Sequence, residues 1–208
     1  VTMDVRFTGD WYNIEKENSS ATALINGGCS IISQHADSMG APNACEEAKV
    51  PDITYNGSTE KACPETYVIS SKINWEIYFE YALGKINEGK AIATDWCEGL
   101  GSELDNGAVA LGTPGKKAAA EGTEAKLKEV AASLRSGSLK VFDCSKFTVN
   151  GEHLTSYKAD VDFDKNYTKD TEVIKTEGGV TYFAESEFRS APYFDLWIDG
   201  ITNLDAAK

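Results

Sequence analysis

Short apolar segments alternate with amphipathic ones along the first part of the chain, and this alternation constrains the fold more than any other feature. Strands are expected at residues 5–9, 29–34, 50–55 and 67–71. Helices are expected from Asn13 to Gly27, over 41–48, and from Trp75 to Gly89. This order is typical of parallel βαβ units with right-handed crossovers. The sequence therefore predicts an α/β protein whose strands end along one edge of a sheet, where ligands bind in open α/β folds.

The segment that begins at Trp75 has the clearest helical periodicity. Its apolar side chains recur at i, i+3, i+4, i+7, i+8 and i+11, as Trp75, Tyr78, Phe79, Ala82, Leu83 and Ile86. This spacing predicts the best-defined helix of the sequence, with Gly89 as its stop. A more polar helix is expected over 121–136, and its inward side chains would be Leu127, Val130, Ala131 and Leu134.

The strand–helix alternation ends after Gly89. Residues 90–120 are rich in Gly, Ala and charge, and from 138 onward the sequence favours strands. Strands are expected at 139–142 and 147–149, with a hairpin turn at Asn150-Gly151. We therefore expect an α/β lobe over residues 1–142 and a strand- and turn-rich extension over 143–208 that packs on the lobe.

The charge balance excludes several classes of partner. The chain of 208 residues has 33 acidic and 20 basic side chains, a net charge of −13. This balance argues against binding to nucleic acid or to an anionic membrane surface. No run of about 18 apolar residues occurs, so no segment is expected to span a bilayer. The chain opens without a signal-peptide pattern, which fits either a cytosolic protein or the mature or trimmed form of an exported one.

Motifs for catalysis, metals and cofactors are mostly absent. The sequence has no phosphate-binding glycine loop, no GxSxG and no HExxH, and we expect no cofactor. Its five cysteines include no CxxC pair, so buried thiols are expected, although a Cys63–Cys97 disulfide is possible. The acidic runs at 15–17 and 160–164 are interpreted as solvated faces, because the second lacks the glycine and glutamate of a calcium loop.

Three residues at the expected binding edge are candidates for a site. His35 and Asp37 share a loop after the second expected strand, where they could bind an organic ligand, make structural contacts, or serve as a base or metal pair. Zinc would need more ligands than these two. Trp11 follows the first expected strand, where it could stack on a planar ligand or pack over the start of the next helix.

Several segments together resemble one protein family. The stretches are DWYNIEKENSSATALINGGCSIISQHADS, VISSKINWEIYFEYALGKINEGK and ELDNGAVALG, which include Gln34-His35-Ala36-Asp37-Ser38 and Asn74-Trp75. Over residues 5–142 the chain resembles the second half of the basic membrane protein family, the substrate-binding lipoproteins of ABC importers that include purine nucleoside receptors. The resemblance implies a periplasmic-binding-protein type I fold with two Rossmann-like lobes of three α/β/α layers. It also implies that this chain is mainly the C-terminal lobe, without most of the other lobe and without the lipid-modified cysteine, and that the hinge-crossing segment lies around 90–145.

The resemblance also assigns binding residues. Trp11 matches the family's stacking aromatic, and the loop after the second strand contributes His35, Asp37 and Ser38 to the pocket. Asn56 stands where the nucleoside receptors have the aspartate that binds the ribose hydroxyls. Lys72 lies one place from the position of the family's lysine.

The function implied by the resemblance is capture of a ligand, without chemistry. The ligand would be a purine nucleoside, a purine base or another small planar molecule, and an ABC transporter permease would be the partner. Such a receptor would be extracytoplasmic, on the cell surface or in the periplasm, and anchored by lipid alone. One lobe would supply half of the contacts, so we expect weak or no binding by this chain. The alternatives are a Rossmann-like nucleoside hydrolase using His35 and Asp37, and a sugar or peptide receptor of the same fold.

Overall fold

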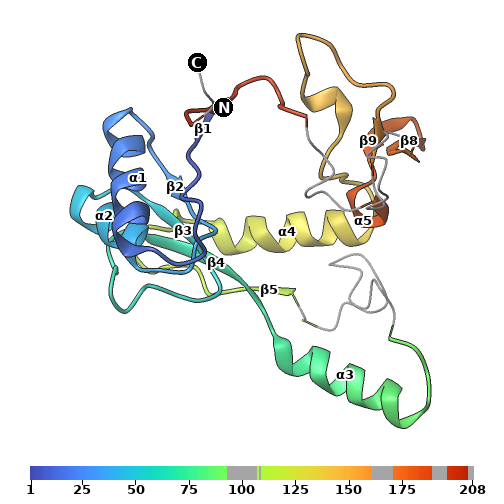
Figure 1. The fold of residues 1–208 in the computed structure, drawn as a ribbon, viewed down its shortest axis with the longest axis horizontal. Helices are drawn as coiled ribbons and strands as arrows, with labels where there is room; N and C mark the ends of the chain where they lie inside the picture. The colour runs from blue at the N-terminus through green and yellow to red at the C-terminus, as the bar shows by residue number, and fades with distance from the viewer. Residues whose placement is uncertain (93–106, 108, 161–170, 189–195, 206–208) are drawn as a thin grey trace.

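The computed structural model of the chain describes residues 1–92, 107, 109–160, 171–188 and 196–205 (Figure 1). Its elements are β1 (Met3–Val5), α1 (Ile14–Asn26), β2 (Ile32–Ser33), α2 (Gly40–Ala48), β3 (Asp52–Tyr55), β4 (Tyr67–Ile73), α3 (Trp75–Asn87), β5 (Val109–Leu111), α4 (Thr123–Arg135), the 3₁₀ helix η2 (Cys144–Lys146), β6 (Lys158–Ala159), β7 (Thr171–Glu172), β8 (Ile174–Glu177), β9 (Val180–Phe183), α5 (Glu185–Phe188) and β10 (Ile201–Asn203).

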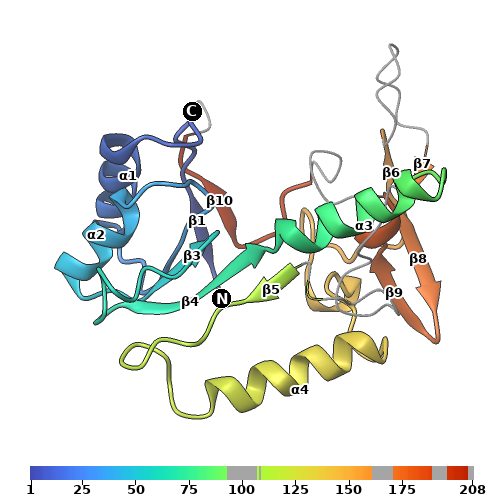
Figure 2. The same cartoon turned by 90° about the horizontal axis from the view of Figure 1, so that it is seen from below.

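A four-stranded sheet in the order β2-β3-β4-β5 forms the centre of the N-terminal part (Figure 2). Strands β2, β3 and β4 run parallel, as the βαβ pattern predicts, and β5 pairs antiparallel to β4. The sequence analysis did not predict β5, which is only three residues long and follows a segment rich in Gly and charge. The α/β class is confirmed, and the carboxyl ends of β2 and β3 lie side by side.

The first strand differs from the prediction. A strand was expected at 5–9, but β1 covers Met3–Val5 and pairs parallel with β10 instead of joining the four-stranded sheet. The residues after β1 are held by Asp205, whose carboxylate accepts the backbone N–H of Phe7 at 2.5 Å and forms an ion pair with Arg6 at 3.4 Å. Gly9, with φ at +71°, ends the extended conformation. Distant chain segments, and not local preference, therefore decide where this strand lies.

Helices α1 and α2 pack against each other beside the sheet (Figures 1 and 2). The side chain of Asn13 accepts the N–H of Lys16, which is the N-cap that the sequence predicts. Where the helices meet, Ala21, Ala41 and Ala44 form a buried cluster of small side chains. Small residues at this contact let the two backbones approach closely.

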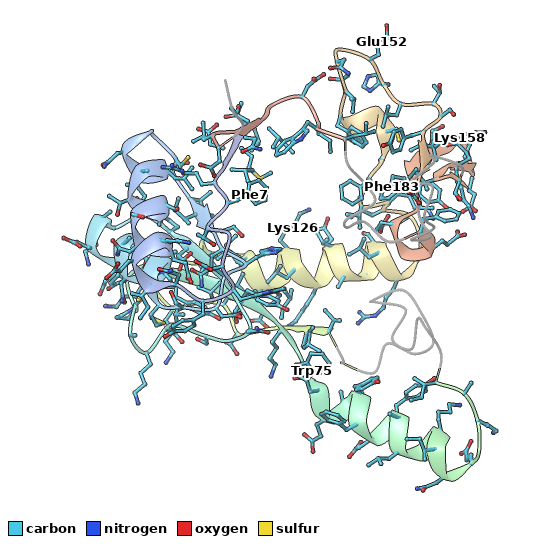
Figure 3. The ribbon with its side chains drawn as sticks, viewed as in Figure 1. Phe7, Trp75, Lys126, Glu152, Lys158 and Phe183 are labelled. Carbon is cyan, nitrogen blue, oxygen red and sulfur yellow. The ribbon has the colours of Figure 1, made fainter. Side chains whose placement is uncertain are left out.

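Helix α3 forms where its periodicity predicts it, and most of its apolar stripe is exposed. Trp75, Phe79, Leu83 and Ile86 are 56–63% exposed, and within the stripe only Ala82 is buried. The helix leads away from the sheet at the end of β4, with Trp75 at its start (Figures 1 and 3). Helix α4 also forms as predicted, but its expected inward side chains are only half-buried.

The C-terminal part has a small apolar core of its own. Cys144, Val173 and Phe183 are buried there, and Phe142 packs on Phe183 with ring centroids 5.8 Å apart (Figure 3). The strand expected at 139–142 is wrong, because residues 141 and 142 form a turn before η2.

The hairpin at Asn150-Gly151 is confirmed. Both residues have positive φ, +54° and +83°, and Val149 bridges Glu152 across the turn. Residues 161–164 of the acidic run at 160–164 lie outside the described residues, and so does Cys97.

Candidate functional site

Three of the predicted residues are joined by hydrogen bonds at the carboxyl edge of the sheet. The backbone N–H of Asp37 donates to the carbonyl oxygen of Trp11 at 2.8 Å. The carboxylate Oδ1 of Asp37 accepts Asn56 Nδ2 at 3.1 Å. Asn56 has a φ of +65° and donates its own backbone N–H to Ser71, which turns its side chain toward Asp37 just after β3 ends. The loops after β1, β2 and β3 thus meet in one place.

His35 belongs to the same edge. Its ring stacks on Tyr55, the last residue of β3, with centroids 5.8 Å apart and an interplanar angle of 24°. The imidazole is exposed, and Trp11 is 82% exposed. The structure therefore presents both rings to solvent, and the alternative in which Trp11 packs over the start of α1 is not observed.

A cavity of about 640 Å³ opens between the segment after β1, helix α1 and the free edge of β2. Its lining combines aromatic and apolar side chains with polar and charged ones, among them Phe7, Trp11, Leu24, Gln34, Arg6 and Glu17. Its volume is in the range of small-molecule sites, about 300–1,000 Å³. Asp37 and Asn56 are outside its lining and lie beside it, through the hydrogen bonds described above.

Glu17 is a site residue that the sequence analysis missed. The interpretation of the acidic run at 15–17 as a solvated face is wrong for Glu17, which is only 3% exposed. Its carboxylate accepts the backbone N–H of Asn13 at 2.9 Å and that of Ser38 at 3.1 Å, which ties the start of α1 to the His35 loop. The helical spacing contained the signal, because Glu17 is four residues before the buried Ala21 and shares its face.

Ser38 and Lys72 have different surroundings from the other predicted residues. Ser38 is buried, and its hydroxyl accepts the N–H of Gly40 at the start of α2, so its side chain already has a structural partner. Lys72 is exposed on β4, opposite Ala110 of β5. Neither residue lines the cavity. Both assignments stay predictions from the resemblance.

A buried carboxyl group lies at the opposite end of the sheet. Asp52 begins β3 and is fully buried, and this burial raises its pKa from 3.8 to about 7. The thiol of Cys45 is buried near it, and burial together with Asp52 raises the pKa of Cys45 to about 12. In the described part of the chain, no three His, Cys, Asp or Glu side chains are grouped so as to hold a metal ion.

The membrane and thiol predictions can be compared with the described residues. No helix among them is both long and apolar enough to cross a bilayer. Cys45, Cys63 and Cys144 are buried free thiols, as expected, and Cys29 is a half-buried one.

The chain is similar to proteins that are named as parts of ABC transport systems. Over 88 residues it is 32% identical to TsgA13 of Haloferax volcanii, which is named as an ABC transporter glucose-binding protein, covering 42% of this chain and 22% of TsgA13. Among solved structures it is similar to an ABC transporter solute-binding protein of Conexibacter woesei, at 21% identity with a TM-score of 0.46 over 65% of this chain and 45% of that one. A solute-binding protein of Aeropyrum pernix matches at 16% identity with a TM-score of 0.46, over 71% of this chain and 48% of that one.

The chain spans about a fifth of the length of the curated relative and less than half of each solved chain. The family described as Bmp, "ABC transporter substrate-binding protein PnrA-like", matches residues 1–134. Its members are solute-binding proteins, a class without enzymatic activity, so the comparisons do not favour the hydrolase alternative. Because this match covers more than half of the chain, the chain belongs to the Bmp family of PnrA-like ABC transporter substrate-binding proteins.

Proposed function

We propose that the chain provides one ligand-binding wall of an ABC importer's substrate-binding protein, and that its ligand is a small planar molecule, a purine nucleoside or a purine base. The observation that carries this proposal is the hydrogen-bonded connection of Trp11, Asp37 and Asn56 beside a cavity of about 640 Å³. An exposed indole next to a cavity can stack on a flat ring, and stacking combines apolar burial with dispersion.

The polar residues suit the edge of such a ligand. Asp37 Oδ1 is occupied by Asn56, whereas Asp37 Oδ2 and Asn56 Oδ1 have no hydrogen bond within the described residues. Both are acceptors, so they can take hydroxyl or N–H donors from a ribose or a base. The exposed ring of His35 can add a contact from the cavity side. Ser38 and Lys72 complete the proposed set on the strength of the family resemblance alone.

The partners belong to the same proposal. A second lobe would close over the ligand and shift an equilibrium between open and closed forms, as binding proteins do. An ABC transporter permease would receive the ligand, and the protein would work outside the cytoplasm as a lipid-anchored receptor. The separate core around Phe183 supports the proposed division into a lobe at 1–142 and an extension at 143–208.

Ligand-observed saturation-transfer NMR with the 208-residue chain tests the binding proposal, because it detects weak binding. Adenosine, guanosine and hypoxanthine are expected to bind with Kd values weaker than micromolar, since one lobe supplies only part of the contacts. Trp11→Ala should weaken binding about fivefold, because losing an aromatic stack costs on the order of 1 kcal/mol. Trp75→Ala is the matched control, since Trp75 is also exposed but lies on α3. Equal effects of the two substitutions would contradict the proposed site.

The second candidate ligand is a sugar, and one observation favours it. The matched relative TsgA13 is named as a glucose-binding protein, and an exposed tryptophan can stack on a sugar face as well as on a base. Glucose therefore belongs in the same NMR panel. Saturation transfer to glucose that depends on Trp11, with the purines inert, would replace the purine proposal by the sugar proposal.

A further inference from the structure

Strand β2 has a strand partner on one edge only. Among the described residues it pairs with β3 alone. The backbone N–H of Ile32 donates to the carbonyl of Pro51 at 2.9 Å, and that of Gln34 donates to the carbonyl of Ile53 at 3.1 Å. Backbone groups of successive residues point to opposite edges of a strand. The N–H and C=O of the exposed Ser33 therefore point away from β3, to the edge of β2 that borders the cavity of about 640 Å³.

Strand β1 borders the same cavity from the other side. Met3 and Val5 line the cavity, and they form the backbone hydrogen bonds to the β10 segment, at 2.8 and 3.0 Å. By the same alternation the backbone groups of Asp4 point away from β10, so β1 also has one edge without a strand partner among the described residues. The two strands run in the same direction, because the loops that follow them meet where Asp37 donates its N–H to Trp11.

The cavity has the size of a short strand. A strand rises about 3.3 Å per residue, its neighbours lie about 4.8 Å away and the next layer lies about 10 Å away, so one strand residue fills roughly 160 Å³. The cavity of about 640 Å³ therefore holds about four residues in extended conformation. Its lining includes Ala21, Leu24 and Ala41 of α1 and α2. The two alanines are small, which leaves room for larger apolar side chains above them.

We infer that an extended apolar segment of the same receptor, from outside these 208 residues, fills the cavity as a strand between β1 and β2. The 88 matched residues are 22% of TsgA13, so that relative has about 400 residues, enough to supply such a segment. The added strand joins the β1–β10 pair to the four-stranded sheet. It also covers two strand edges, which otherwise invite pairing with other chains.

The inference goes beyond the proposed function and leaves its residues in place. Trp11 follows β1, Asp37 follows β2 and Asn56 follows β3, so all three lie at the carboxyl ends of the strands. The planar ligand is expected to stack on Trp11 at that end, while the added strand lies alongside β2.

A synthetic strand added to the 208-residue chain tests the inference. The probe is the peptide acetyl-KVVIVVK-amide, and its control is the same peptide with alternate backbone nitrogens methylated, which blocks hydrogen bonding along one edge. Binding is followed by NMR titration of the ¹⁵N-labelled protein and by amide hydrogen exchange. The unmodified peptide should slow exchange at Asp4 and Ser33 at least tenfold, and the methylated peptide should bind at least tenfold more weakly.

A substitution at Ser33 tests the same contact from the protein side. Ser33→Pro removes the N–H at the free edge of β2 and leaves the hydrogen bonds of Ile32 and Gln34 to β3 in place, so it should weaken peptide binding at least tenfold. Ser33→Val is the matched control, because it keeps the N–H and should bind the peptide as the wild-type chain does. If the NMR spectrum shows that Ser33→Pro does not fold, the methylated peptide decides alone.

Each outcome supports or overturns the inference. It is overturned if the peptide does not bind the wild-type chain, or if neither methylation nor Ser33→Pro weakens binding. A dimer in sedimentation velocity that Ser33→Pro abolishes would show that a second copy fills the cavity, which also overturns it. Displacement of adenosine by the peptide would assign the whole cavity to the ligand, with the same result. Peptide binding without any binding of purines or glucose leaves the inference standing while the proposed function fails.

Discussion

Replacing Asp52 by asparagine should stabilise the protein at neutral and alkaline pH. Both carboxylate oxygens of Asp52 are buried and have no partner among the described residues, and burial raises the pKa from 3.8 to about 7. A charge there is costly because nothing compensates for the lost hydration. Asparagine keeps the shape of the side chain and is neutral at every pH.

The magnitude follows from the shift in pKa. Well below pH 3.8 the carboxyl group is neutral in the folded and unfolded states, so it adds no pH dependence there. Between about pH 4 and pH 7 only the unfolded state ionises, and the free energy of unfolding falls by about 1.4 kcal/mol per pH unit. The total loss for Asp52 is roughly 4 kcal/mol, and it levels off above pH 7.

Urea denaturation from pH 4 to pH 8, followed by tryptophan fluorescence, measures this effect. Asp52→Asn should match the wild-type protein near pH 4 and exceed it by up to roughly 4 kcal/mol at pH 8. Glu47→Gln is the control, because Glu47 is an exposed acid on α2 and its replacement should leave the pH profile unchanged. Parallel profiles for Asp52→Asn and the wild-type protein, or a less stable variant at pH 8, would refute the reasoning.

Three further predictions concern packing, the buried glutamate and the thiols. Gly40→Ala should lower the free energy of unfolding, measured by urea denaturation, by more than about 2 kcal/mol, because a Cβ would lie 2.8 Å from the Cβ of Glu17. Gly84→Ala in α3 is the control, because a Cβ there meets open space, and it should be neutral or stabilising. Glu17→Gln should cost about 1–3 kcal/mol by the same measurement, because one oxygen cannot accept both backbone N–H groups. Iodoacetamide labelling followed by peptide mass spectrometry should modify Cys29 quickly and leave buried Cys45 unlabelled, and equal labelling would contradict the burial described here.

Local signals in the sequence predicted most elements of the lobe. The cap at Asn13, the stop at Gly27 and the turn at Asn150-Gly151 depend on residues within a few positions of each other, and each is present. The charge of Glu17 predicts that its side chain is exposed. Its carboxylate is buried because the backbone N–H of Ser38, from a loop elsewhere in the chain, donates to it, and the sequence around Glu17 does not show this contact. Periodicity likewise shows which residues of α3 share a face, but not what covers it.

For the candidate site, the sequence predicts which residues lie at the same edge of the sheet but not all of the contacts that they make. The parallel-sheet rule places His35, Asp37 and Asn56 at one edge, and the hydrogen bond between Asp37 and Asn56 agrees with that placement. The hydrogen bonds that the Gln34 amide donates to the carbonyl oxygens of Ala36 and Ser38 were not predictable, because they depend on which way the amide points.

The pairing of β1 with β10 has a consequence for the order in which the chain folds. Arg6 and Asp205, which flank this pair, are 199 positions apart in the chain. During synthesis β1 leaves the ribosome before β2, β3 and β4, yet its partner β10 is translated after all three, which can therefore assemble before β1 is paired. Contacts between residues so far apart form late and slowly, because closing the long loop between them costs chain entropy. We therefore expect β1 to pair with β10 only after β2, β3 and β4 have assembled, and the segment bearing Trp11 to reach its final position at that stage.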